Sequence, residues 1–325
     1  MSTAPTQAPA RPSAVRTWIL AARPHTLPAA GAGVAVGLGA ALATGAPLRF
    51  DTALACLAVA LLLQVLANFA NDLSDFRRGA DTPDRQGPLR VAASGLVTER
   101  QLEVAIAITI GLAGLVGLYL VLVGGWALLA IGVLAVVAAL AYTGGPFPYG
   151  YRAMGEIFVF IFFGLVAVAG TAYLQSLTFD PLYVVAAVPP GALITAILVV
   201  NNLRDIPTDT AAGKRTLAVV LGKRRTQGEY GALLGVAYAV PVFLFLSWMA
   251  AGVGPTGAGT PLLPAVLLPL LTLPKASVLL RAVRTFREPR ELNLVLKGTA
   301  SLSLWFGVLF AVGLALLGLI RTGAS

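Results

Sequence analysis

Two short stretches of this sequence concentrate carboxylates in a way that favours metal chemistry. The first acidic window is NDLSDFRRGADTPDR, from Asn71, and the second is NNLRDIPTDTAAGKR, from Asn201. Six of the fourteen acidic residues fall in them: Asp72, Asp75, Asp81, Asp84, Asp205 and Asp209. The first two acids of each window are three or four residues apart, so they share one face of any helix that continues through them. Carboxylates this close repel one another, and Mg²⁺, which prefers one or two carboxylates plus water and substrate phosphates, relieves the repulsion.

Cations and amides accompany both windows. Arg78 follows the first acid pair and Lys214 the second. A guanidinium group binds phosphate oxygens in a bidentate fashion, and a lysine adds a mobile point charge. Asn68, Asn71 and Asn201 interrupt segments otherwise made of Leu, Val and Ala, and polar groups in such segments usually line an interior cavity. The acids, cations and amides together predict a diphosphate site that uses a metal ion.

The composition is that of an integral membrane protein. Of the 325 residues, 58% are hydrophobic and 11% are charged, with a mean hydropathy of +0.85, whereas soluble domains carry about 25% charged residues. The apolar stretches are continuous rather than alternating, so the spans are helices and not barrel strands. The net charge of +9 does not indicate a nucleic-acid partner, because the basic residues lie in connections between apolar segments.

Nine apolar segments are predicted as membrane spans. They cover residues 24–45, 52–73, 101–123, 126–142, 154–176, 182–203, 229–252, 261–283 and 299–320. Of the 23 basic residues, 20 fall on the side of the N-terminus and two, Arg49 and Arg321, on the other. The positive-inside rule therefore predicts a cytoplasmic N-terminus, both acidic windows on the cytoplasmic side and the C-terminus outside.

The acidic windows also contain a short internal sequence repeat. NDLSD, from Asn71, and NNLRD, from Asn201, each close a predicted span and are 130 residues, or four spans, apart. An even number of spans returns the chain to the same side of the membrane. The sequence repeat therefore predicts two parallel four-helix repeats plus a ninth helix. The predicted fold is thus an all-α, polytopic membrane helix bundle. Residues 1–15, rich in Pro, Ala and Thr, are predicted to form a disordered cytoplasmic tail.

Three segments resemble one family. NDLSDFRRGADTPDRQGPLRVAASGL, YTGGPFPYGYRAMGE and NNLRDIPTDTAAGKRTLAVVLG are together similar to the UbiA superfamily of intramembrane prenyltransferases, and most similar to its 1,4-dihydroxy-2-naphthoate prenyltransferase branch. The superfamily pattern is NDxxDxxxD, but Gly79 occupies the third acid position here and the next acid is Asp81. The form NDxxDxxxGxD is that of the naphthoate branch. A metal-binding role for Asp81 therefore follows from the resemblance alone.

The resemblance implies nine helices around a central cavity, formed by residues 16–325 as a single intramembrane prenyltransferase domain. It implies Mg²⁺-dependent transfer of a polyprenyl group from an allylic diphosphate to 1,4-dihydroxy-2-naphthoate, with decarboxylation, in the inner (cytoplasmic) membrane. Metal-binding roles are implied for Asp72, Asp75, Asp205 and Asp209. Tyr142 of the YTGGP turn, Arg23 and Arg152 are expected near the aromatic acceptor, with Arg90 as a further candidate for its carboxylate.

Other functions are compatible with parts of the pattern. Another aromatic acceptor, such as 4-hydroxybenzoate or homogentisate, would use the same donor site. A cation-coupled transporter would also place acids in a helical membrane bundle. Many transporters have inverted repeats with a site at the membrane midplane, whereas the predicted repeats here are parallel and the acids lie at one face. A CDP-alcohol phosphotransferase also uses aspartates at the membrane face, but its DGxxAR pattern is absent. Prenyl chain length, oligomeric state and any role of His25 do not follow from the sequence.

Overall fold

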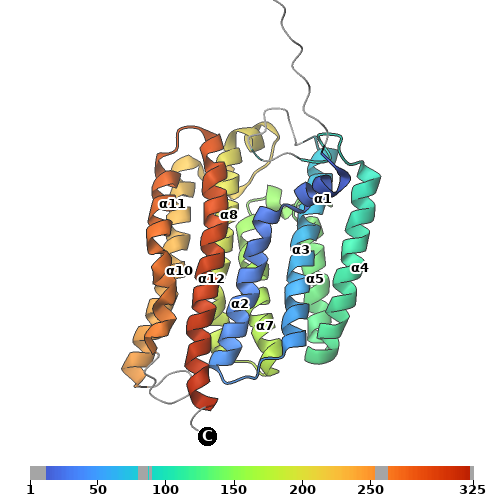
Figure 1. Cartoon of the computed structure of the whole chain (residues 1–325). Coiled ribbons are helices and arrows are strands. Elements are labelled where there is room, and N and C mark those ends of the chain that lie inside the picture. The colour runs from blue at the N-terminus through green and yellow to red at the C-terminus, as the bar shows by residue number, and fades with distance from the viewer. Residues whose placement is uncertain (1–11, 80–86, 88–89, 253–262, 323–325) are drawn as a thin grey trace, which may run out of the picture.

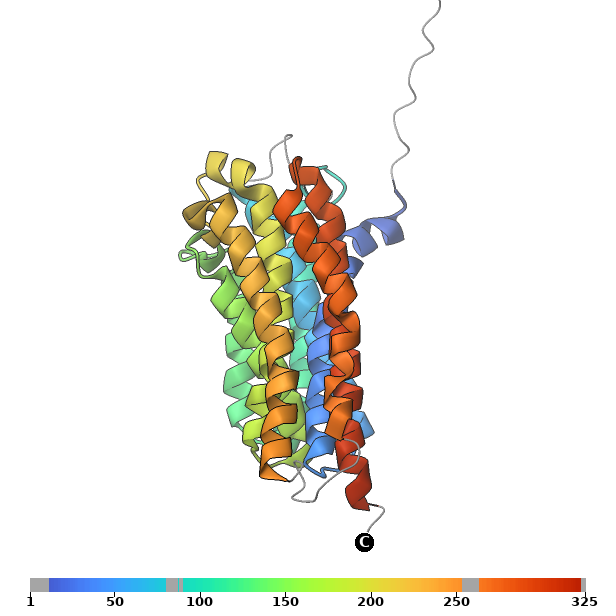
Figure 2. The same ribbon diagram turned by 90° about the vertical axis from the view of Figure 1, so that its left-hand side faces the viewer.

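A computed structural model describes residues 12–79, 87, 90–252 and 263–322. Within these ranges the chain is a bundle of long helices without a β-strand (Figures 1 and 2), which confirms the predicted fold class. Of the predicted tail, residues 1–11 lie outside the described ranges. Residues 14 and 15 already belong to the first helix, α1 (Ala14–Ala22), because Ser13 caps it by accepting a hydrogen bond from the backbone N–H of Arg16.

The first half of the bundle places the first acidic window at the end of a long helix. After α1 come η1 (Pro24–Thr26), α2 (Leu27–Ala43), α3 (Phe50–Arg77), α4 (Glu99–Gly124) and α5 (Ala127–Ala141). The α3 helix continues four residues past the predicted end of its span. Asp72 and Asp75 therefore lie in its last turns, on one helix as predicted.

The second half contains more short elements than the first. Its elements are η2 (Tyr149–Tyr151), α6 (Gly155–Val159), the π-helical η3 (Phe160–Val166), α7 (Ala167–Ser176), α8 (Pro181–Ala211), α9 (Leu217–Leu221), α10 (Lys223–Ala251), η4 (Leu263–Thr272), α11 (Leu273–Thr285), η5 (Pro289–Glu291) and α12 (Leu292–Thr322). The α8 helix continues eight residues past the predicted span end, so Asp205 and Asp209 also lie on one helix.

Eight helical segments in the described ranges are long and apolar enough to cross a membrane. Each of the nine predicted spans falls on a helix or on consecutive helical segments. The count of nine is not confirmed, because α5 has only 15 residues. At 1.5 Å per residue it is about 22 Å long, shorter than the ~30 Å hydrocarbon core of a bilayer.

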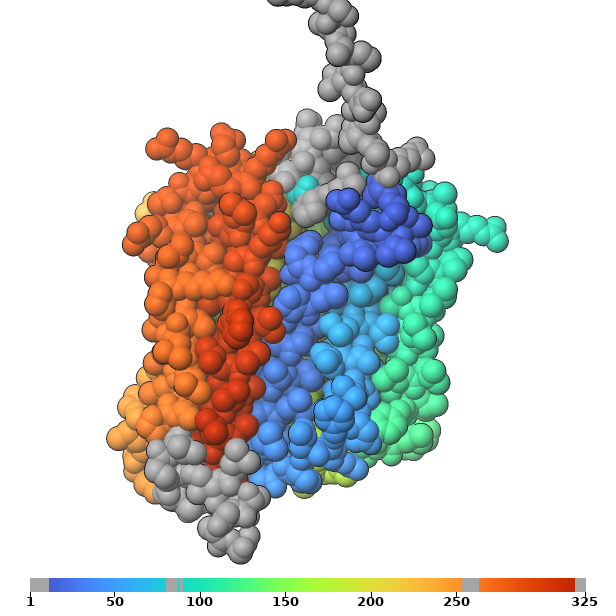
Figure 3. All heavy atoms as spheres, in the orientation of Figure 1, coloured from blue at the N-terminus to red at the C-terminus, as the bar shows by residue number. Residues whose placement is uncertain are grey.

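The core of the bundle lies around α8, which packs against α2, α10 and α12. Helices α2 and α12 run side by side and form a continuous seam on one face (Figures 1 and 3). Small residues make this seam close: a Cβ atom on Gly39 would lie 2.5 Å from the carbonyl oxygen of Ala311, and one on Gly307 would lie 3.0 Å from the Cβ of Ala32. Such small-residue contacts are a common way for membrane helices to approach closely.

The α3–α5 side of the bundle is packed more loosely. The α5 helix packs mainly against α3 and α4, and Ala138 is its single buried residue. Most of α5 thus faces outward, and its inner side borders a large cavity. A capping box at Thr98, whose side chain accepts from the N–H of Gln101 while Gln101 accepts from the N–H of Thr98, fixes the start of α4.

Candidate active site

A cavity of about 700 Å³ runs through the bundle beneath the two acidic windows. Its wall includes both Cys56, near the start of α3, and Asp75, near its end. Nineteen residues of helix separate them, so the cavity extends about 28 Å along the axis of α3. Its volume lies in the ~300–1,000 Å³ range of small-molecule sites. Charged and amide side chains gather at the end that holds the acidic windows, and the rest of the wall is mostly apolar.

Asp75 is contacted at this end from three parts of the chain. It is 2% exposed, and three side chains from other parts of the chain reach its carboxylate. The Tyr151 hydroxyl donates to Oδ1 at 2.6 Å, Lys214 Nζ lies 3.2 Å from Oδ1, and Arg90 Nη2 donates to Oδ2 at 3.0 Å. Burial, together with the Asp75 carboxylate, raises the pKa of Tyr151 far above its ordinary value, so this hydroxyl stays protonated and donates.

Asp72 lies behind Asp75 and does not line the cavity. Its Oδ2 accepts from the backbone N–H of Val91 at 3.1 Å, and its Oδ1 lies 3.9 Å from Arg90 Nε. The residues that follow Arg90 include Val91 and Val97, whose apolar side chains pack against α3 and α4. Asp72 therefore fixes the loop that carries Arg90, and this loop places Arg90 on both acids of the first window.

The second window is held from within its own helix. Arg204 is 1% exposed, and its Nε and Nη2 donate to the two oxygens of Asp205 at 2.8 and 2.6 Å. The same guanidinium donates to Asn201 at 2.7 Å and to Asn293 of α12 at 2.8 Å. The bidentate pair with the neighbouring residue thus orients Asp205 from within its own helix.

Lys214 joins the two windows. Its backbone N–H donates to the carbonyl of Asp209 at 2.8 Å, while its side chain reaches Asp75. The next residue, Arg215, donates its N–H to the carbonyl of Tyr151 at 3.1 Å, which pairs this loop with η2. The Lys214 ammonium also lies 4.7 Å from the centre of the Tyr151 ring. The loop after α8 thus brings cation, acid and tyrosine together.

The predicted amides all line the cavity and also serve as structural links. Asn68 donates to the carbonyl of Ala22 at 2.9 Å and to the Thr26 hydroxyl at 3.1 Å. Asn71 accepts from the Thr143 hydroxyl at 3.0 Å. Asn68 and Asn71 thus link α3 to neighbouring segments, whereas Asn201 accepts from Arg204 within α8.

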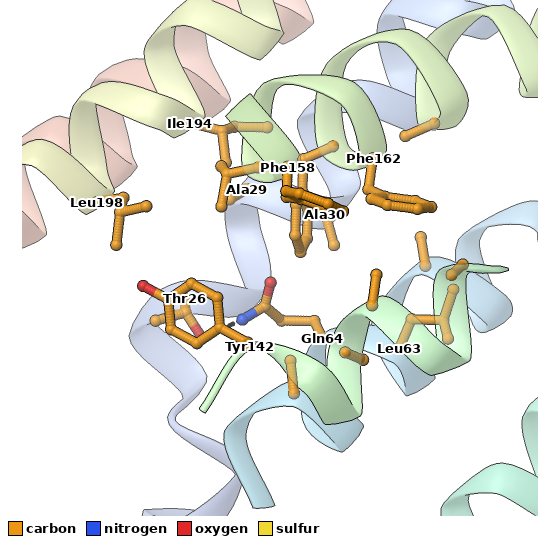
Figure 4. A pocket seen from close by; sticks show the side chains of 18 of the residues that line it. Thr26, Ala29, Ala30, Leu63, Gln64, Tyr142, Phe158, Phe162, Ile194 and Leu198 are labelled. Carbon is orange, nitrogen blue, oxygen red and sulfur yellow. Dashed lines mark hydrogen bonds between the residues drawn. The ribbon is translucent and has the colours of Figure 1, made fainter. Parts of the chain in front are cut away.

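Two of the predicted acceptor residues line the cavity and one does not. Figure 4 shows Tyr142 and Gln64 on one side of the cavity and Phe158 and Phe162 on the other.

Arg23, the second of these lining residues, follows α1 in a left-handed conformation, with φ of 52°. Arg152 is exposed and lies outside the cavity wall, with its guanidinium 4.0 Å from the centre of the Phe147 ring.

The remaining predicted residues divide in the same way. Arg78 is exposed at the rim, donates to the carbonyl of Gly145 at 2.7 Å and lies 5.6 Å from the Tyr151 ring centre. Asp81 lies outside the described residues. The predicted residues that line the cavity are Arg23, Asn68, Asn71, Asp75, Arg90, Tyr142, Asn201, Asp205, Asp209 and Lys214.

Sequence reasoning missed Tyr151 and Arg204. Tyr151 stands inside the YTGGPFPYGYRAMGE segment, nine residues after Tyr142, but nothing in its spacing indicates contact with Asp75. Arg204 was counted among the cations of a cytoplasmic loop, whereas the structure buries it inside α8. Its position directly before Asp205 was the available signal, because a buried acid needs a partner of opposite charge.

The donor set suits Mg²⁺ without forming a dense cluster. In the described part of the chain, no three acidic, histidine or cysteine side chains converge on one point. Mg²⁺ requires only one or two carboxylates when substrate phosphates and water complete its shell. Asp75, Asp205 and Asp209 line the cavity with oxygen donors and with amides beside them. These residues fit a hard cation that is bound together with a phosphate.

Comparisons with known proteins identify relatives of this chain. The model of the UbiA prenyltransferase family matches residues 32–286. A relative from Mycobacterium tuberculosis named 1,4-dihydroxy-2-naphthoate octaprenyltransferase is 42% identical over 300 residues, which cover 92% of this chain and 96% of the relative. A relative of the same name from Haemophilus influenzae is 37% identical over 309 residues, with coverage of 92% and 96%.

Solved structures share the fold. A UbiA homolog from Archaeoglobus fulgidus, bound to GPP and Mg²⁺, superposes with a TM-score of 0.61 at 16% identity and covers 91% of this chain and 99% of its own. A UbiA homolog from Aeropyrum pernix gives a TM-score of 0.61 at 18% identity, with coverage of 93% and 98%. The family match and the close relatives together settle the classification: this chain belongs to the UbiA prenyltransferase family.

Proposed function

We propose that this protein transfers a polyprenyl group from an allylic polyprenyl diphosphate to 1,4-dihydroxy-2-naphthoate, with loss of carbon dioxide, to form demethylmenaquinone or demethylphylloquinone, in its reduced hydroquinone form, in quinone biosynthesis. One observation carries the proposal: a membrane-deep apolar cavity ends in a cluster of acids, amides and cations. An amphipathic substrate with a charged head and an isoprenoid tail matches this division. The relatives that carry the naphthoate name support the choice of acceptor.

The charged end is proposed to bind the diphosphate. Asp72, Asp75, Asp205 and Asp209 would hold Mg²⁺, joined by Asp81 on the strength of the resemblance. When bound, Mg²⁺ supplies positive charge to the leaving diphosphate. Lys214 and Arg78 are proposed to contact the phosphate oxygens, with Asn68, Asn71 and Asn201 beside them. The Tyr151 hydroxyl, which donates to Asp75, and the guanidinium of Arg90 keep that carboxylate oriented.

The apolar part of the cavity is proposed to hold the reacting carbon. The bond between the allylic carbon and the diphosphate oxygen breaks, a bond to a ring carbon forms, and the carboxylate carbon leaves as carbon dioxide. Phe158 and Phe162 present rings to this space (Figure 4), and aromatic faces attract a cationic carbon. Tyr142 and Arg23 are proposed to meet the acceptor, with Arg23 near its carboxylate. Because the helices pack around one cavity, residues 16–325 are proposed to be a single domain.

The test is a matrix of donors and acceptors. Purified protein is incubated with Mg²⁺, geranyl or octaprenyl diphosphate, and either 1,4-dihydroxy-2-naphthoate or 4-hydroxybenzoate, and products are identified by mass. We expect a prenylated naphthalene product and release of labelled carbon dioxide in equal amounts. Prenylation of 4-hydroxybenzoate alone, with its carboxylate retained, would contradict the acceptor assignment. Cation flux into vesicles without any prenyl transfer would favour the transporter.

We also propose that the acidic windows face the cytoplasm in an inner (cytoplasmic) membrane, on the basis of the basic-residue asymmetry. Ala93 and Thr178 are exposed residues in connections at opposite ends of the bundle. In a Cys56→Ala background, Ala93→Cys should react with an impermeant thiol reagent only from the cytoplasmic face and Thr178→Cys only from the other. Labelling of both from one face would rule out this topology.

A further inference from the structure

Glycines in the helices of this bundle fall into two groups according to what an added Cβ atom would meet. A Cβ on Gly37 would lie 2.6 Å from the carbonyl oxygen of Val168, and one on Gly39 would lie 2.5 Å from that of Ala311. These glycines are required by close backbone packing. At Gly117, Gly132 and Gly170 an added Cβ has no neighbour within 4 Å, and none of the three has a positive φ.

The three open glycines line the cavity from three different helices. Gly117 is on α4, Gly132 on α5 and Gly170 on α7. A glycine in a helix costs about 1 kcal/mol relative to alanine. Neither packing nor backbone conformation requires glycine at these positions, so the property they share is the space that they leave in the cavity.

The three glycines lie at one depth. Each is five to seven residues from the helix end remote from the acidic windows: Gly117 from Gly124, Gly132 from Ala127 and Gly170 from Ser176. At 1.5 Å per residue this distance is about 8–11 Å for all three. They therefore form one level of small residues near the far end of the cavity, opposite the carboxylates.

We propose that Gly117, Gly132 and Gly170 set the longest prenyl chain that the protein accepts. This inference rests on the proposed function in that the donor is a prenyl diphosphate whose head lies at the acidic windows. A short chain ends before the glycine level, whereas a long chain must pass it. A side chain at this level narrows the cavity where only a long tail is present, so the glycines determine chain-length specificity.

The experiment substitutes each glycine separately with leucine: Gly117→Leu, Gly132→Leu and Gly170→Leu. Gly111→Leu is the matched control, because Gly111 is also on α4 and also has open space around an added Cβ, but does not line the cavity. Each variant is assayed for kcat/KM with geranyl and with octaprenyl diphosphate and the same acceptor. Affinity for each diphosphate is measured separately by ligand-induced thermal stabilisation, which needs no acceptor.

We expect the three cavity variants to keep the wild-type kcat/KM for geranyl diphosphate within about threefold. Their kcat/KM for octaprenyl diphosphate should fall by about 10- to 100-fold, because the added side chain overpacks a space that the long tail fills. The Gly111→Leu variant should retain the wild-type ratio for the two donors. Alanine at the same cavity positions should give a smaller shift in the same direction.

Unchanged use of octaprenyl diphosphate in all three leucine variants would overturn the inference, as would an equal loss for both donors in folded variants. The same chain-length shift in Gly111→Leu would also overturn it. Failure of the proposed acceptor is a separate outcome, because the ratio of the affinities for the two diphosphates is measured without any acceptor.

Discussion

Asp75 in the first acidic window and Asp205 in the second are both buried at the same end of the cavity, yet their partners come from different parts of the chain. Asp75 is contacted by side chains from η2, from the loop after α8 and from the segment before α4. Asp205 is paired with the adjacent Arg204 of its own helix. The first window is therefore an assembled site, and the second is pre-oriented by local structure.

The two acids therefore differ in how firmly their geometry is fixed, although the sequence patterns around them are similar. An acid whose partners arrive from three loops can exchange them when substrate binds, because loops are the more variable part of a scaffold. An acid in a bidentate pair that is further tied to Asn201 and Asn293 keeps its geometry. We therefore expect the first window to respond most in activity and the second most in stability.

The largest expected effect on turnover comes from Asp75→Asn. This change keeps size but removes the charge toward which Tyr151, Lys214 and Arg90 converge, so kcat should fall by about 10²–10³-fold or more, as when one electrostatic stabiliser is removed. Steady-state kinetics with saturating Mg²⁺ provides the measurement. Asp51→Asn, at an exposed acid outside the cavity wall, is the control and should retain activity. Activity within threefold of wild type in Asp75→Asn would show that this acid is structural.

The second effect is on stability. Arg204→Met leaves Asp205 buried without its guanidinium partner, which should cost about 3–5 kcal/mol of unfolding free energy. Adding Asp205→Asn removes the isolated charge and should recover most of that loss. Denaturant unfolding in detergent measures both variants. If the double variant is no more stable than the single one, the pair is not the unit that holds the second window.

A smaller effect is expected from Tyr151→Phe. The ring over which Lys214 lies remains, but the hydrogen bond that the Tyr151 hydroxyl donates to Asp75 is lost. A hydrogen bond to a charged group contributes about 1.5–3 kcal/mol. We expect roughly a tenfold fall in kcat/KM with the fold retained. Tyr149→Phe serves as the comparison, because it removes a hydroxyl that donates a hydrogen bond to the carbonyl of Ala138 rather than to an acid. Equal losses in both variants would argue against a specific role for Tyr151.

The smallest effect should follow from Arg77→Ala. Arg77 is exposed and pairs with Glu99 and Glu103 at the start of α4, away from the cavity. Exposed ion pairs contribute about 0–1 kcal/mol, so activity should stay within about twofold. Arg78→Ala, one residue along the helix at the rim of the site, should raise the KM for the prenyl diphosphate. A larger effect from Arg77 than from Arg78 would reverse the assignment of these two cations.

Much of the architecture was accessible to sequence reasoning because it depends on local periodicity and composition. Apolar length predicted the helices, and the three- and four-residue spacing of the acids placed each pair on one helix. The contacts that Asp75 makes were not accessible, since they join residues far apart in the chain. Arg204 illustrates the other limit: a count of charges assigns it to a loop, because the count does not register that α8 continues to Ala211 or that Asp205 lies within reach.

The placement of Arg152 was beyond reach for the same reason. Its position beside the YTGGP turn suggested contact with the acceptor, but the backbone pairing of Arg152 with Arg215 turns the side chain outward onto Phe147. Asn68 was expected at the diphosphate, and it also supports the segment that carries Arg23. Both placements depend on tertiary packing, to which spacing along the chain is blind.

The glycine-rich seam between α2 and α12 has a consequence for biosynthesis. Chains are made from the N-terminus at about 5–20 residues per second, so α2 enters the membrane tens of seconds before α12. During that interval the small-residue face around Gly39 has no permanent partner, and the bundle is closed only by the last helix made. A chain that ends before α12 therefore lacks the partner of the small-residue face around Gly39, which in the complete protein packs against Ala311.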